Sequence, residues 1–185
     1  MYKWYYNTPC EFSPIVMVSD GEYLTGLWFE GSRFMPETKN YDEKYISVFA
    51  ETSRWLDIYF SGKNPDFTPP YKLFELTPFR KRVAEIMLSI PYGEVATYND
   101  IAKQIASERG ISIMSAQAVG GAVGHNPICI IIPCHRVVGS DGSLTGYGGG
   151  LENKKALLCC EKSAFIIDAE VCPDNKNDST TDYIK

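Results

Sequence analysis

The sequence lacks the features that mark membrane, secreted and metal-dependent proteins. Its apolar runs are shorter than the roughly 18 residues that cross a bilayer, and no leader of basic and then apolar residues opens the chain. Its 6 cysteines show no disulfide framework, since Cys159 and Cys160 are neighbours, and it has 2 histidines and no C-x-x-C pair. We therefore expect a cytoplasmic protein with free thiols, no metal site and no cofactor.

Positive charge is also scarce, because 18 basic residues stand against 23 acidic ones and the net charge is −5. This balance argues against a generic basic binder of nucleic acid. The charge is uneven, however: residues 1–77 carry −4, residues 78–162 carry +2 and residues 163–185 carry −3. The mildly basic middle segment fits an anionic partner and ordinary surface variation equally well.

Apolar residues make up 44% of the chain, which is enough for a packed core. In the first part, Tyr2–Asn7, Ile15–Val18 and Tyr23–Phe29 read as strands, and the last two form a predicted hairpin. Tyr41–Phe60 carries its apolar side chains on one face and predicts a helix. The proline-rich stretch 61–76 then predicts a linker and a domain boundary.

Short helices are expected in the second part. Thr77 and Pro78 suit the first positions of a helix that runs to Leu88. The pattern Thr97-x-x-Asp100 resembles a capping box, which would begin a second helix. This second helix should end near residue 107.

A third helix, Ala116–Val123, would be capped by Ser112 or Ser115 and has almost no bulky side chains. Gly120 and Gly121 each cost about 1 kcal/mol of helix propensity relative to alanine. They fit close packing against another helix and close approach of a nucleic-acid groove equally well. Two short helices with a tight connection form the minimal helix-turn-helix arrangement.

We therefore expect an α+β protein of two domains. Residues 1–76 would form a small antiparallel sheet with a helix and a linker. Residues 77–162 would form a mostly helical domain with the helix-turn-helix. Residues 163–185, which are acidic and rich in Asp, Asn and Thr, would form a flexible tail.

One segment has the composition of a nucleophile site. Ile128–Ile132 is an apolar run of strand length, which Pro133 ends, and Cys134-His135-Arg136 follows at once. Cationic neighbours lower the pKa of a thiol and favour the reactive thiolate. A buried inert thiol is the common alternative, and Cys129, inside the apolar run, fits it better than Cys134 does.

The spacing of Cys134 and His135 argues against a direct bond between them. Consecutive side chains of an extended chain point to opposite faces, so either the chain turns here or a water bridges the two groups. Downstream, 139–150 contains 6 glycines and predicts a loop. No Gly-Lys-Ser/Thr follows, so a flexible pocket wall is favoured over a phosphate loop. A closing helix, Leu151–Glu161, would place a glutamate at its end.

The segment Ile132–Val138, Ile-Pro-Cys-His-Arg-Val-Val, resembles the O6-alkylguanine-DNA alkyltransferases, also called methylated-DNA–protein-cysteine methyltransferases. The resemblance extends from about Phe79 to Glu161, roughly half of the chain, and Pro-Cys-His-Arg-Val is highly specific for that family. The supporting motifs are Gly93-Glu94-Val95, Thr97-Tyr98, Ala118-Val119-Gly120-Gly121-Ala122, Asn126-Pro127, Tyr147, Gly149-Gly150-Leu151 and Glu161.

The resemblance implies a chemical role for several residues. Cys134 would accept the alkyl group, and His135 would activate it through a water while Glu161 orients the imidazole. Asn126 would brace the helix-turn-helix against the active-site segment. Tyr98 would donate a proton to the leaving guanine. Arg136 would hold structure rather than contact DNA.

The resemblance also implies a monomer with a winged helix-turn-helix, away from membranes. Its substrate would be double-stranded DNA carrying O6-alkylguanine, or O4-alkylthymine, with the target base flipped out. The implied DNA-contacting residues are Arg80, Tyr98, Asn99, Ser112, Gln117, Ala118, Gly121 and Ser140, and the implied base pocket is Tyr147, Gly148 and Gly149.

Three features depart from the family pattern. Gln117 stands where the family often has an arginine, so we expect weaker DNA affinity or a shallower salt dependence. Gly148 stands where some relatives have a serine beside the guanine oxygen. Some relatives bind zinc in the N-terminal domain, but here that domain has only Cys10 and no histidine.

Three other functions share some of these sequence features. A lesion-binding protein without transfer activity would share the fold but lack the acceptor, and Cys134 argues against it. A thiol hydrolase using Cys134 and His135 lacks an evident oxyanion arrangement and has the wrong spacing. A transcription factor of the helix-turn-helix type would carry a basic recognition face, which this acidic chain lacks.

Overall fold

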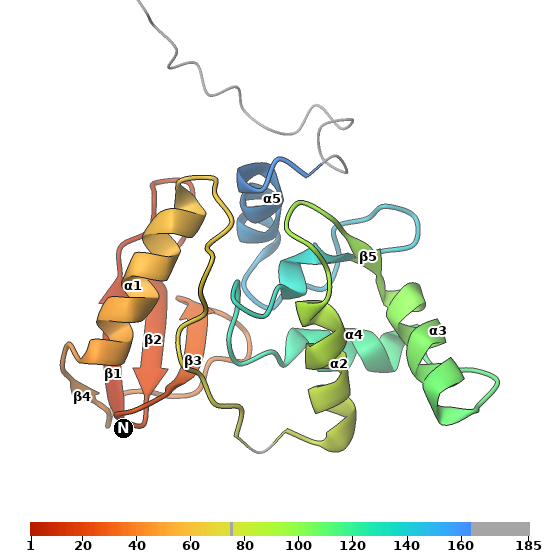
Figure 1. Ribbon diagram of the computed structural model, residues 1–185, viewed down its shortest axis with the longest axis horizontal. Helices are drawn as coiled ribbons and strands as arrows, with labels where there is room; N and C mark the ends of the chain where they lie inside the picture. Colours follow the sequence, from red (N-terminus) through yellow and green to blue (C-terminus); the bar gives the residue numbers. More distant parts are fainter. Residues whose placement is uncertain (75, 164–185) are drawn as a thin grey trace, which may run out of the picture.

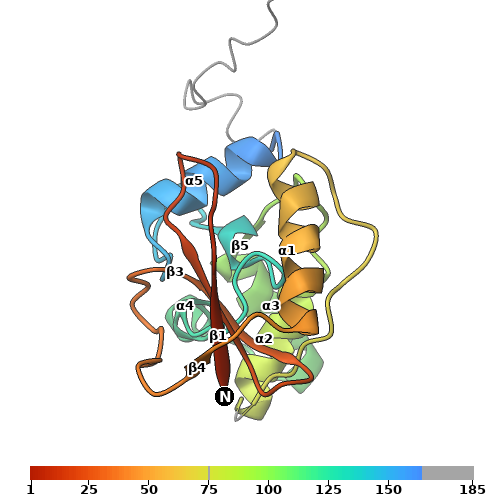
Figure 2. The same cartoon turned by 90° about the vertical axis from the view of Figure 1, so that its left-hand side faces the viewer.

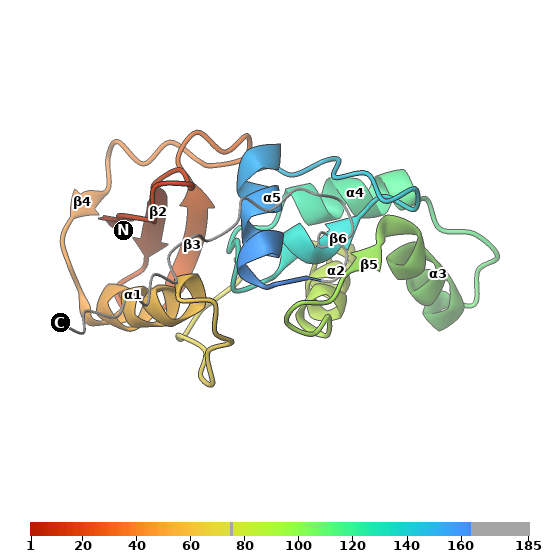
Figure 3. The ribbon, with the colours of Figure 1, turned by 90° about the horizontal axis from the view of Figure 1, so that it is seen from above.

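The computed structural model describes residues 1–74 and 76–163, and its two halves lie side by side (Figure 1). One half holds a sheet and helix α1, the other holds helices α2, α3 and α4, and helix α5 lies between them (Figure 3). Within the described residues, no helix combines the length and the apolar character that crossing a membrane requires.

The sheet has the strand order β3-β2-β1-β4. Strands β1 (Tyr2–Tyr6), β2 (Ile15–Ser19) and β3 (Leu24–Phe29) pair antiparallel, as expected, and all of β2 is buried because it lies in the middle. A short fourth strand, β4 (Asp42–Glu43), pairs parallel to β1. The sheet is therefore mixed rather than purely antiparallel, because the connection 30–41 crosses back before it adds this strand.

Helix α1 (Ser47–Phe60) covers one face of the sheet (Figure 2). It begins six residues later than the apolar pattern predicts, because Asp42–Glu43 is used as a strand. The helix buries the side chains that recur every three or four residues on one face, namely Val48, Phe49, Thr52, Trp55, Leu56 and Tyr59.

The helices of the second half begin as the sequence predicts. In α2 (Pro78–Leu88), Thr77 accepts a hydrogen bond from the backbone of the first turn. In α3 (Tyr98–Arg109), Thr97 and Asp100 form the predicted capping box. Such bonds satisfy backbone N–H groups that have no partner inside the helix.

Helix α4 (Ala116–Gly124) is capped by Ser115, not Ser112, and packs against α2 and α3. A two-stranded parallel ladder joins β5 (Ala96–Thr97) to β6 (Val137–Val138). Helix α5 (Leu151–Cys160) then closes the described fold.

The predicted strand Ile128–Ile132 is wrong, because this segment is a buried turn. Ile130 has a positive φ of 69°, and the N–H of Ile132 bonds back to the carbonyl of Ile128. The turn docks on strand β3, where Cys129 N donates to Leu27 O over 2.8 Å. A short apolar run signals burial, which a turn provides here as well as a strand would.

Of the five cysteines within the described residues, four fulfil the free-thiol expectation. Cys10, Cys129, Cys134 and Cys160 are free. Cys159 is disulfide-bonded. The expectation is wrong for this residue, because a disulfide depends on two thiols meeting in space and spacing along the chain does not reveal that.

Replacing Thr97 by alanine should lower the free energy of unfolding by about 1 kcal/mol, because it removes the cap of α3. Urea denaturation measures this. The control is Ser107→Ala, which deletes an exposed hydroxyl from the same helix and should change stability by less than about 0.5 kcal/mol. Equal losses in the two variants would contradict the capping account.

Candidate active site

The thiol of Cys134 lies at a small, partly open cavity to which both halves of the chain contribute. Cys134 begins a short 3-10 helix, η1 (Cys134–Arg136), and is 3% exposed. Trp28 and Phe34 line the cavity from the first half, and Asn126, Cys129 and the predicted pocket residues Tyr147, Gly148 and Gly149 line it from the second. The cavity measures about 10 Å³, so a purine base enters only if its walls open.

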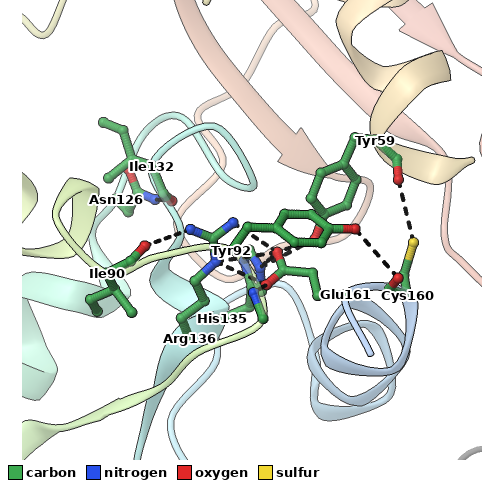
Figure 4. Close-up of polar contacts among 10 residues, drawn as sticks. Tyr59, Ile90, Tyr92, Asn126, Ile132, His135, Arg136, Cys160 and Glu161 are labelled. Carbon is green, nitrogen blue, oxygen red and sulfur yellow. Dashed lines mark hydrogen bonds and ion pairs between the residues drawn. The ribbon is translucent and has the colours of Figure 1, made fainter. Parts of the chain in front are cut away.

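Asn126 fixes both the thiol and the buried turn that precedes it. Its Nδ2 donates to Ile132 O over 2.7 Å (Figure 4). The same Nδ2 donates to Cys134 Sγ over 3.1 Å, and Oδ1 accepts from Ile128 N. The predicted bracing role therefore has a geometric basis, and the residue also contacts the sulfur itself. A donor aimed at sulfur favours the thiolate.

The pKa of Cys134 is lowered. The largest cause is a hydrogen bond from the Cys129 thiol; the Asn126 bond and the charge of Lys154 add to it, while burial opposes it. The same pairing raises the pKa of Cys129, so the proton of the pair stays on Cys129. Cys129 is therefore part of the site, whereas its apolar sequence context suggested an inert thiol.

Lys154 is a second site residue that the sequence did not indicate. Its Nζ is buried and donates to Val137 O over 2.6 Å and to Thr145 O over 3.2 Å. Burial lowers its pKa to about 8, while the nearby Cys134 acts in the opposite direction. At neutral pH a large share of Lys154 is protonated and stabilises a thiolate.

The carboxylate of Glu161 follows α5 directly and is surrounded by donors (Figure 4). His135 Nε2 and the Tyr59 hydroxyl each lie 2.7 Å from Oε1. Arg136 Nε donates to Oε2 over 2.9 Å, and Gly93 N donates to the same oxygen over 3.0 Å. Burial alone would raise the pKa of Glu161, but the bonds and charges of His135 and Arg136 outweigh it and hold that pKa well below its ordinary value.

These contacts determine which nitrogen of His135 carries the proton. An ionised carboxylate only accepts hydrogen bonds, so Nε2, which faces Glu161, is the N–H. Nδ1 has no hydrogen-bond partner among the described residues. Burial lowers the pKa of His135 in spite of Glu161, so the ring is neutral at pH 7 and presents a basic lone pair at Nδ1.

Tyr98 begins α3, and its hydroxyl donates to Thr145 O over 2.8 Å. Burial and the negative charge of a Cys134 thiolate raise its pKa to about 12, so it keeps its proton at neutral pH. A Cβ on Gly120 would come within 3.8 Å of the Tyr98 ring, whereas a Cβ on Gly121 would meet nothing within 4 Å. An added Cβ would make only an ordinary contact at Gly120 and none at Gly121, so close packing does not require glycine at either position.

The residues expected to contact DNA lie in several places. Gln117, Ala118 and Gly121 are exposed on α4 and share one face by their spacing. Ser112, in the loop between α3 and α4, and Ser140, in the loop after β6, are also exposed. The remaining members are half-buried, namely Arg80 on α2 and Tyr98 and Asn99 at the start of α3.

The glycines at the cavity are fixed by close packing. A Cβ on Gly149 would come within 3.0 Å of both Tyr147 and Phe29, and one on Gly148 would lie 3.2 Å from Gly124 O. Over the described ranges, no cluster of histidine, cysteine, aspartate and glutamate side chains has an arrangement that could hold a metal ion.

Comparisons with known proteins place this site in a family. Residues 78–163 match the family model of the 6-O-methylguanine DNA methyltransferase DNA-binding domain. The methylated-DNA–protein-cysteine methyltransferase of Haemophilus influenzae is 38% identical over 166 residues, which are 90% of this chain and 89% of that protein. Its counterpart from Mycobacterium tuberculosis is 40% identical over 155 residues, 84% of this chain and 90% of that one.

Solved structures agree with this placement. The Mycobacterium tuberculosis OGT in complex with DNA superposes with a TM-score of 0.76 at 37% identity, covering 88% of this chain and 94% of that one. An O6-methylguanine DNA methyltransferase from Methanococcus jannaschii gives a TM-score of 0.57 at 28% identity, covering 85% and 92%. The chain therefore belongs to the methylated-DNA–protein-cysteine methyltransferase family.

Replacing Cys129 by alanine should raise the pKa of Cys134, because the thiolate loses a hydrogen-bond donor. The measurement is the pH dependence of iodoacetamide alkylation at Cys134, followed by peptide mass. Cys10→Ala, which removes an exposed thiol, is the control and should leave the midpoint unchanged. A Cys129→Ala midpoint equal to that of the wild type would show that the two thiols are not coupled.

Proposed function

We propose that this chain repairs DNA by transferring an alkyl group from O6-alkylguanine to Cys134, once per molecule. The observation that carries the proposal is a buried thiol with a lowered pKa, next in sequence to a neutral histidine held by a carboxylate. The thiolate attacks the alkyl carbon, an S–C bond forms, and the C–O bond to guanine breaks. The thioether product is stable, so the protein is consumed.

The proton movements follow from the assigned hydrogen positions. Cys134 loses its proton through a water to Nδ1 of His135, the one ring nitrogen with a free lone pair. The imidazolium that results is stabilised by Glu161, as its hydrogen bond to Nε2 becomes charge-assisted. Tyr98 keeps its proton at neutral pH and donates it to the departing guanine, exchanging Thr145 O for the base. Solvent then returns a proton to Tyr98 and takes one from the His135 imidazolium, so the reaction has no net proton change.

The DNA would lie along the exposed face of α4. Gln117, Ala118 and Gly121 would enter a groove, as a recognition helix does. The remaining contacts would come from Arg80, Tyr98, Asn99, Ser112 and Ser140. The target base would leave the stack and occupy the cavity lined by Tyr147, Gly148 and Gly149, after the walls near Phe34 have opened.

The oligomeric state, location and domain division of the protein are also proposals. We propose that it acts as a monomer in the cytoplasm, without a cofactor. Residues 1–76 would form one domain and 77–162 the alkyltransferase domain, a division that the start of the family match at residue 78 supports. The segment 163–185 is proposed as a flexible tail, but its first residue, Ser163, is buried and its N–H donates to Leu158 O over 3.0 Å. The rest of this segment, 164–185, lies outside the described residues.

Incubation with a duplex carrying O6-methylguanine should add the mass of one methyl group to each protein molecule, at Cys134. Intact mass spectrometry measures this, and Cys134→Ser should gain nothing while still binding the duplex. Binding without any mass gain in the wild type would favour the lesion-binding alternative. Repeated turnovers, or methylation of the serine variant, would refute the mechanism.

Replacing Gln117 by arginine should tighten binding to the duplex, because it adds a positive charge on the exposed face of α4. The slope of log affinity against log salt should steepen by about one unit. Fluorescence anisotropy across salt measures both. Ala50→Arg, which adds the same charge on the exposed side of α1, is the control and should change neither. No gain for Gln117→Arg at low salt would refute this interpretation of Gln117.

A further inference from the structure

Tyr59 is a buried residue of α1 that reaches the catalytic cluster from the other half of the chain. Its side chain is 1% exposed, and its hydroxyl donates to Glu161 Oε1 over 2.7 Å and lies 3.3 Å from His135 Nε2 (Figure 4). We propose that Tyr59 is a positioning residue for alkyl transfer, whose hydroxyl orients Glu161 and thereby His135. This inference rests on the transfer function proposed above.

The direction of the hydrogen bonds gives the hydroxyl two functions. Glu161 is ionised and only accepts, so the Tyr59 O–H must point at the carboxylate. The hydroxyl oxygen then turns its lone pairs toward His135, where the Nε2–H is shared between Tyr59 and Glu161. The tyrosine therefore holds the tautomer that leaves Nδ1 basic.

The position of the Tyr59 ring does not depend on its hydroxyl. The ring stacks on Trp55 with centroids 5.4 Å apart and an interplanar angle of 8°. It also meets Tyr92 edge-on at 6.0 Å and His135 edge-on at 6.3 Å. The end of α1 is further tied to α5, because Cys160 Sγ donates to Tyr59 O. Phenylalanine would therefore keep the packing and lose only the hydroxyl.

The other groups around Glu161 determine how losing the Tyr59 hydroxyl would affect Glu161 and His135. Arg136 and Gly93 N continue to bond the carboxylate, so it stays ionised without Tyr59. The hydroxyl, however, draws electron density from Oε1, the oxygen that His135 uses. Without it, Oε1 attracts the imidazolium more strongly and the pKa of His135 rises. Tyr59 itself does not titrate in this range, because burial and Glu161 raise its pKa far above 10.

The pH dependence of transfer reports on this geometry. Transfer needs neutral His135, so its rate rises with pH through the pKa of that residue. The groups that act on His135 are Glu161, Arg136 and Lys154 by charge, together with the Tyr59 hydroxyl. Tyr59→Phe should therefore move the midpoint of the rate profile to higher pH.

The experiment is single-turnover methyl transfer from an O6-methylguanine duplex at saturating protein, across pH, for the wild type and Tyr59→Phe. On the high-pH plateau, where His135 is neutral in both proteins, the rate of Tyr59→Phe should fall about tenfold, because Glu161 and His135 lose the hydrogen bond that orients them. DNA affinity and the final yield of one methyl group per protein should not change. The matched control is Tyr92→Phe, whose hydroxyl bonds Cys160 O over 3.4 Å, and its profile should match that of the wild type.

Replacement of Tyr59 by 3-fluorotyrosine, which keeps the shape and donates more strongly, should move the midpoint to lower pH. If Tyr59→Phe does not fold, the pH profile of the 3-fluorotyrosine variant tests the positioning role in its place. A Tyr59→Phe profile equal to that of the wild type, or equal losses in Tyr59→Phe and Tyr92→Phe, would overturn the positioning role. Absence of transfer in the wild type would instead refute the proposed function.

Discussion

The rest of the structure depends on the hydrogen bonds that surround the buried carboxylate of Glu161. Burying a carboxylate costs several kcal/mol unless donors replace its water, and here donors meet both of its oxygens. They come from α1, from the turn before β5 and from η1, while Glu161 itself follows α5. One carboxylate thereby fixes four segments that are distant in sequence. Because its pKa is lowered by folding, its stabilising effect is complete at neutral pH and is lost only as pH falls toward strong acid.

This constraint explains how adjacent residues can cooperate without a direct bond. The 3-10 turn at Cys134–Arg136 sends the thiol into the cavity and the imidazole toward Glu161. The ionisation states of the thiol and the imidazole are then set by different neighbouring groups. Cys129, Asn126 and Lys154 favour the thiolate. Burial keeps the imidazole neutral, while Glu161 and Tyr59 hold its proton on Nε2 and leave Nδ1 basic. A protein that is consumed in one transfer needs no route for releasing a product from its acceptor, which is compatible with so small a cavity.

Much of this could be predicted from the sequence where the signal is local. Strand patterns and helix caps predicted β1, β2 and β3 and the starts of α2 and α3, and the family resemblance named Cys134, His135, Glu161 and Asn126. The short strands β4, β5 and β6 were not predicted. The turn at 128–132 could not be predicted, because an apolar run signals burial and not its backbone geometry.

Tyr59 and Lys154 could not be found either, because only folding brings them to the site. Tyr59 is 1 of 12 tyrosines and lies on the ordinary apolar face of a helix. Lys154 looks like a solvated charge on α5 until its buried partners are seen.

The most direct test of the central claim is the single-turnover transfer rate of Glu161→Gln, measured with an O6-methylguanine duplex at saturating protein. Glutamine keeps the shape but removes the charge that stabilises the imidazolium. The rate should fall at least about tenfold, which is the loss expected when a charged hydrogen bond becomes neutral. DNA affinity should be unchanged. A rate equal to that of the wild type, in a variant that binds the duplex normally, would contradict the account.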